Sequence, residues 1–138
     1  MEKQKIVVQA TVNQTVDKIW EYLNLPEHIT KWNSASEDWH TPRAVNDLRV
    51  GGQFNYRMEA KDGSYGFDFS GKYHEVELNR RIAYTLDDGR KVLIELEPVE
   101  AGVNVKYTFE AEESNSMEMQ RSGWQAILDN FKKYSEMQ

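Results

Sequence analysis

The 138-residue sequence contains no cysteine and only three histidines. The absence of cysteine excludes disulfide bonds, thiolate metal ligands and a cysteine nucleophile. The histidines are His28, His40 and His74, and none of their spacings is the i, i+2 or i, i+4 of a metal-binding pair. A Gly-x-Ser-x-Gly motif and a glycine-rich phosphate loop are also absent. The sequence therefore predicts no metal site and no bound cofactor.

Long apolar segments are absent as well. No apolar run approaches the ~20 residues that a membrane-spanning helix needs, and residues 1–5 contain no apolar region of a secretory signal. A cytoplasmic protein without a membrane span is therefore expected. The net charge of -6 argues against nucleic acid as a partner, because phosphate binding requires a basic surface.

Aromatic residues are abundant: four Trp, seven Tyr and five Phe make up 12% of the chain. Each aromatic side chain buries a large area, and Tyr and Trp add a polar group. Most of them are expected in the core. Their number in a chain of this length also favours a pocket lined by aromatic rings.

Alternation of apolar and polar residues, typical of strands with one buried face, recurs along six segments. The predicted strands cover residues 6–12, 54–59, 65–76, 82–86, 92–96 and 103–110. Residues 33–47 show no period, so they are expected to form a long connection. Gly51-Gly52, just before the second predicted strand, is a candidate bulge or sharp bend.

Helical periodicity appears in three places, at residues 15–24, at residues 27–32, and from about Ser116 almost to the end. Apolar and amide side chains on one side of the last helix form a long stripe: Met117, Gln120, Trp124, Ile127, Leu128, Phe131 and Tyr134. Gly123 interrupts this helix, which predicts close approach of another backbone or of a ligand.

This order of elements predicts one α+β domain over residues 1–138. The long C-terminal helix is the only element large enough to cover several strands. We therefore expect a curved antiparallel sheet of about six strands around that helix, with two short helices after the first strand.

Several segments resemble the heat-shock protein 90 ATPase activator homologue-1-like family. The Gly-Gly-x-Phe and Gly-Trp-x-x-x-Leu motifs are the most specific. The similar segments are Val16-Asp17-Lys18-Ile19-Trp20, residues 26–32, residues 47–54, Asp62-Gly63, residues 69–76, residues 81–85 and residues 123–131.

The resemblance implies the helix-grip fold of the START-like (SRPBCC, Bet v 1-like) superfamily. It also implies a cavity between sheet and helix, which the superfamily commonly uses for hydrophobic small molecules. Lipid carriers, plant hormone receptors and aromatic polyketide cyclases share the fold. The family name further implies a chaperone as a candidate partner and a connection with stress response.

The leading functional hypothesis is therefore binding of a small apolar or aromatic molecule without catalysis. The predicted ligand-binding residues come from the inward faces of the elements: Trp32, Trp39, Phe54, Tyr56, Met58, Phe67, Phe69, Tyr73, Tyr84, Met117, Gln120 and Trp124. One alternative is a chaperone-associated interaction domain. Another is a cyclase or hydrolase that uses cavity tyrosines, with Glu75 or His40 as a proton donor. The sequence leaves monomer and homodimer open.

Overall fold

The computed structural model describes residues 4–138, so the first three residues of the predicted domain lie outside the described part. Seven strands and three helices are found there, and no helix among these residues is long and apolar enough to cross a membrane. In chain order they are β1 (Lys5–Val12), α1 (Val16–Asn24), α2 (Pro26–Trp32), β2 (Trp39–Asn46), β3 (Gln53–Ala60), β4 (Gly66–Glu77), β5 (Arg81–Leu86), β6 (Lys91–Val99), β7 (Gly102–Glu110) and α3 (Met117–Glu136).

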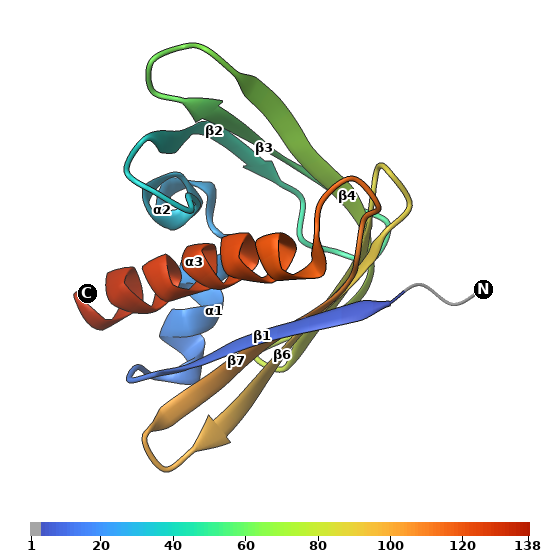
Figure 1. Cartoon of the computed structure of the whole chain (residues 1–138). Coiled ribbons are helices and arrows are strands. Elements are labelled where there is room, and N and C mark those ends of the chain that lie inside the picture. Colours follow the sequence, from blue (N-terminus) through green and yellow to red (C-terminus); the bar gives the residue numbers. More distant parts are fainter. Residues whose placement is uncertain (1–3) are drawn as a thin grey trace.

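All seven strands form one antiparallel sheet in the order β1-β7-β6-β5-β4-β3-β2. Figure 1 shows that the sheet is curved and that α3 crosses its concave side, with α1 and α2 beside the C-terminal half of α3. The predicted α+β helix-grip architecture is confirmed. The three predicted helices also agree with the structure to within about two residues at each end.

The seventh strand, β2, corrects the prediction of a long connection over residues 33–47. It pairs with β3, but its register shifts between His40 and Arg43, around Pro42. A bulge of this kind breaks the alternation of faces on which recognition of a strand depends. Proline fits here because β2 is an edge strand of the sheet.

A second register shift, between Tyr73 and Glu75 in β4, decides where Glu75 lies, the residue that the cyclase or hydrolase alternative uses as a proton donor. After the shift, Val76 pairs with Ile82 and packs against the core. Glu75 is 40% exposed, and its carboxylate forms an ion pair of 3.3 Å with Arg81. After Phe69, Gly71 and Tyr73, the next residue of β4 on the inward face is therefore Val76 and not Glu75.

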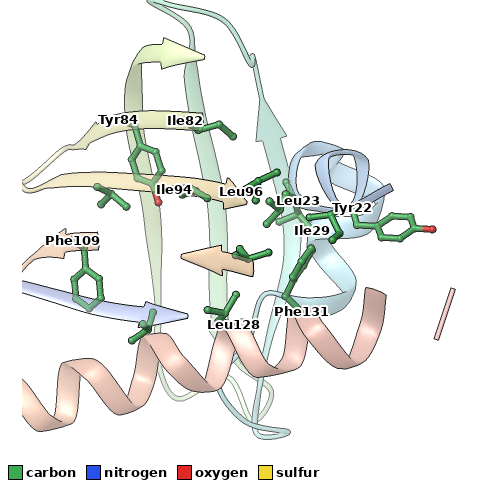
Figure 2. Packing of buried hydrophobic residues seen from close by; sticks show 14 of the residues in the cluster. Tyr22, Leu23, Ile29, Ile82, Tyr84, Ile94, Leu96, Phe109, Leu128 and Phe131 are labelled. Carbon is green, nitrogen blue, oxygen red and sulfur yellow. The ribbon is translucent and has the colours of Figure 1, made fainter. Parts of the chain in front are cut away.

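The apolar stripe of α3 is the centre of the core. Phe131 is 0% and Leu128 is 3% exposed. Figure 2 shows both side chains in the space between α3 and the sheet, on the side from which Phe109 of β7 projects. The ring of Trp32 meets Phe131 edge-on at 4.9 Å between centroids. The Ser116 hydroxyl caps the helix by accepting a hydrogen bond of 3.1 Å from the Met119 backbone N–H.

Glycine has different roles at the positions that the sequence singles out. Gly51 has φ +85, and a Cβ atom on Gly52 would lie 2.0 Å from the Asp47 carbonyl oxygen, which confirms the sharp bend before β3. At Gly123, by contrast, an added Cβ would have no atom within 4 Å. Within residues 4–138 no backbone outside α3 approaches Gly123, so that part of the expectation is wrong.

Replacing Gly123 by alanine should therefore stabilise the protein. Alanine removes backbone freedom from the unfolded chain and meets open space in the fold, so the free energy of unfolding should rise by roughly 0.5–1 kcal/mol. Urea denaturation measures this change. The matched substitution Gly71→Ala should destabilise the fold, because its Cβ would lie 2.7 Å from the Thr85 carbonyl oxygen and 3.0 Å from the Phe54 ring. Destabilisation by Gly123→Ala would contradict the prediction.

Candidate functional site: an apolar cavity

A cavity of about 220 Å³ lies between the concave face of the sheet and α3. The lining comes from both sides, including Tyr56 of β3, Phe69 of β4, Tyr84 of β5, Tyr107 of β7 and Trp124 of α3. The strands place these side chains because alternate residues point to the same face of a sheet. The helix contributes residues one turn apart.

Eight of the twelve residues that the sequence singles out lie together in this lining. They are Trp32, Tyr56, Met58, Phe67, Phe69, Tyr73, Tyr84 and Trp124. Their convergence is a structural fact, whereas their contact with a ligand stays a prediction.

The other four predicted residues do not line the cavity. Phe54 is 3% exposed and is surrounded by aromatic rings, so it belongs to the core. Met117 packs at the edge of that core. Trp39 lies beside Tyr65 and Phe67, with ring centroids 6.0 Å apart in both cases.

The fourth of these residues, Gln120, closes the loop before α3. Its side-chain oxygen accepts a hydrogen bond of 2.8 Å from the Glu112 backbone N–H. Its amide group donates to the carbonyl oxygens of Glu112, at 3.1 Å, and Asn115, at 2.9 Å. A buried amide with these partners has a structural role.

Sequence reasoning missed other residues of the lining: Leu23, Asn24, Asn33, Ile82, Arg90, Ile94, Tyr107, Ile127 and Leu128. For Tyr107 a signal existed, because it falls on the apolar face of β7 with Val105 and Phe109. Arg90 follows the turn after β5, where neither composition nor period distinguishes it from a solvated arginine.

Trp124 forms both a wall of the cavity and a contact with the core. Its indole stacks on Phe109 with 3.9 Å between centroids and 12° between planes. The Phe69 and Tyr107 rings approach it edge-on at 5.9 Å and 6.3 Å. This packing fixes the orientation of the indole, so the cavity wall that it forms is rigid.

One polar side of the cavity is saturated by internal hydrogen bonds. The Tyr56 hydroxyl interacts with that of Tyr73, which donates to the Asn46 side-chain oxygen. Asn46 in turn donates to the Asn24 backbone carbonyl at 2.8 Å. The Asn24 amide donates to the Trp20 carbonyl at 2.9 Å. These groups therefore have little capacity left for a ligand.

Burial shifts the ionisation of the cavity tyrosines. Desolvation raises the pKa of Tyr84 well above its ordinary value of 10.0; the charges of Tyr107 and Tyr73 add to the rise, and Arg90 opposes it. Desolvation also raises the pKa of Tyr56 and Tyr107. All of these phenols are neutral hydrogen-bonding groups at physiological pH.

No carboxylate and no histidine is found among the lining residues that the structure describes. His40 is 43% exposed beside Glu59, at 3.8 Å, and His28 meets the Tyr134 hydroxyl at 2.6 Å. No group of three or more metal-binding side chains occurs within residues 4–138. The cavity can therefore exclude water and donate hydrogen bonds, but it presents no group that takes up protons near neutral pH.

A second hollow, of about 810 Å³, lies between the β1–α1 connection, the β6–β7 turn and the end of α3. Two of its charged side chains, Lys132 and Glu136, already have partners. The Lys132 ammonium donates to Glu136 at 2.8 Å and to the Thr11 carbonyl at 2.7 Å. The Glu136 carboxylate also accepts from the Asn13 backbone N–H at 2.8 Å. The smaller apolar cavity is thus the better candidate site.

A family model described as Activator of Hsp90 ATPase homolog 1-like protein matches residues 13–136. An AHSA1-like protein from Aeromonas hydrophila, whose solution structure is known, is 45% identical, with a TM-score of 0.92 over 97% of this chain and 93% of that chain. A protein from Cytophaga hutchinsonii is 47% identical, with a TM-score of 0.81 over 98% of this chain and 92% of that one.

More distant structures share the fold alone. A protein from Chromobacterium violaceum is 22% identical, with a TM-score of 0.86 over 96% of this chain and 98% of that chain. No curated protein matches the sequence significantly.

The buried tyrosines predict a loss of stability at alkaline pH. A phenol whose pKa is higher in the folded state than in the unfolded state keeps its full stabilising contribution below pH ~10 and loses it as the pH rises through the folded pKa. Each such tyrosine should lower the free energy of unfolding by up to about 1.4 kcal/mol per pH unit above pH ~10. Urea titrations at several pH values measure this dependence. Above pH ~10 the free energy of unfolding should fall less steeply with pH in Tyr84→Phe than in the wild type. Equal slopes would show that Tyr84 is not shielded from water.

Proposed function

We propose that this chain, a member of the Activator of Hsp90 ATPase homolog 1-like family, binds a small apolar or aromatic molecule. The proposed binding site is the cavity under α3. The observation that carries the proposal is the convergence of aromatic walls from several strands and from α3 on one unfilled space. A close-packed core normally leaves few voids larger than a water molecule.

The size and lining of the cavity support a small ligand. Its volume of about 220 Å³ is below the roughly 300–1,000 Å³ of pockets that hold drug-sized molecules. One or two aromatic rings, or a short acyl chain, match such a space. Burial of apolar ligand surface contributes roughly 25 cal/mol per Å², and the aromatic walls add favourable ring contacts.

The distribution of titratable groups favours binding over catalysis. The cyclase or hydrolase alternative requires an acid or base beside the tyrosines, and Glu75 and His40 both lie away from the cavity. The remaining candidates are phenols with raised pKa values, which are weak acids at neutral pH. The cytoplasm is the proposed location, because a chain without cysteine suits a reducing compartment.

The description of the matching family model supports a second candidate function, association with a ninety-kilodalton heat-shock chaperone. This activity would use the outer surface of the protein and does not compete with ligand binding. Co-precipitation with the purified chaperone of the same organism tests it, and lack of retention at micromolar concentrations would remove this candidate.

Filling the cavity should abolish ligand binding without unfolding the protein. Ile127 lines the cavity from α3, so Ile127→Phe should lower the affinity for a neutral aromatic probe, 2-naphthamide, at least tenfold in isothermal titration calorimetry. The control is Met119→Phe, which adds the same ring at a position of α3 that is 62% exposed. Equal affinities of the two variants would contradict binding in the cavity, and so would absence of binding to the wild type.

A further inference from the structure

Three polar side chains of the cavity differ from the saturated Tyr73 side because they have hydrogen-bonding capacity to spare. They are Tyr84 of β5, Tyr107 of β7 and Arg90, which follows the turn after β5. All three are donors at neutral pH. They are the part of the lining that can determine which polar group a ligand carries.

Arg90 is unusually buried for an arginine next to a turn. Its side chain is 18% exposed, and its Nε donates to the Asp88 carboxylate at 2.9 Å. A guanidinium has five N–H donors, and the other four have no hydrogen-bond partner within residues 4–138. Arg90 also lines the cavity together with Tyr84 and Tyr107, and its positive charge acts on the Tyr84 phenol.

The two phenols also lack partners. Tyr84 is 6% exposed and lines the cavity, yet its hydroxyl makes no hydrogen bond in the part of the chain that the structure describes. The same holds for Tyr107, which is only half-buried. Tyr73, by contrast, has its Asn46 acceptor. Figure 2 shows Tyr84 projecting from β5 toward the same side of the sheet as Phe109, the side that α3 covers.

Both hydroxyls are open to the cavity, because neither belongs to the fully buried side-chain atoms that lack a partner within residues 4–138. A group that enters the cavity can therefore form hydrogen bonds with them. An acceptor on a ligand satisfies both phenols at once. An anionic acceptor also compensates the positive charge of Arg90, whose planar N–H groups fit the two oxygens of a carboxylate.

We propose that the ligand of this cavity is a small aromatic or short-chain carboxylic acid, whose carboxylate binds the Arg90 guanidinium and the Tyr84 and Tyr107 hydroxyls. The proposal rests on the proposed function and names its ligand class. The apolar part of the acid then lies against the aromatic walls that Phe69 and Trp124 form.

A matched pair of probes tests this assignment. The two are 2-naphthoic acid, which is ionised at neutral pH, and 2-naphthamide, which has nearly the same shape without the charge. Calorimetry on the wild-type protein should show the acid binding about tenfold to hundredfold more tightly, as expected for hydrogen bonds to charged groups. In Arg90→Gln the preference for the acid should fall by at least about fivefold, and the two tyrosines account for what remains.

The tyrosine variants provide a second measurement that leaves the charge in place. Tyr84→Phe and Tyr107→Phe each remove one hydroxyl, and each should reduce the preference for the acid by about twofold to tenfold. Affinity for 2-naphthamide should change less than affinity for the acid. A two-dimensional amide NMR spectrum establishes that each variant keeps the fold.

Arg49→Gln is the matched control for Arg90→Gln. The Arg49 Nε also contacts the carboxylate two residues earlier, that of Asp47, at 2.9 Å, but the Arg49 side chain is 74% exposed. Arg49 does not line the cavity. The preference for the acid should therefore persist in this variant. If Arg49→Gln reduced the preference for the acid as much as Arg90→Gln does, the proposal would be overturned. The preference would then depend only on the net charge of the protein.

The remaining outcomes separate the ligand class from the proposed function. Binding of 2-naphthamide and 2-naphthoic acid with equal affinity would overturn the assignment of a carboxylic acid and leave the proposed function standing. An undiminished preference for the acid in Arg90→Gln would likewise overturn the assignment to Arg90 and leave the proposed function standing. Absence of binding by either probe would overturn both.

Discussion

The packing of α3 against the concave face of the sheet is the interaction on which the rest of the structure depends. Each strand has one apolar face, and only α3 is long enough to cover several of them. The stack of Trp124 on Phe109 and the complete burial of Phe131 hold the helix at two points along its length. Removal of either contact would expose the sheet face to water, at a cost of several kcal/mol.

The cavity follows from the curvature of the sheet. α3 lies against β1, whereas Figure 1 shows β2, β3 and β4 rising away from the helix. Large aromatic side chains narrow this space without filling it. The tyrosines there lose contact with bulk water, which explains both their raised pKa values and the spare donors of Tyr84 and Tyr107.

Most of the architecture could be predicted from the sequence, because periods of 2 and 3.6 report which face of each element is buried. The errors fall where that relation breaks. A bulge interrupts the alternation in β2, so the sequence pattern does not predict that strand. Eight of the predicted cavity residues converge, but alternation cannot separate a cavity wall from a core residue such as Phe54. Arg90 has no sequence signal, because only the folded turn brings it to the cavity.

The central claim is that the space between α3 and the sheet receives a small aromatic molecule in solution. Intermolecular nuclear Overhauser effects between 2-naphthoic acid and the methyl groups of the protein test it most directly. The account predicts contacts of the ring protons with Ile82, Ile127 and Leu128, whose side chains line the cavity. Contacts only with exposed methyl groups, such as those of Val45 and Leu78, would contradict it.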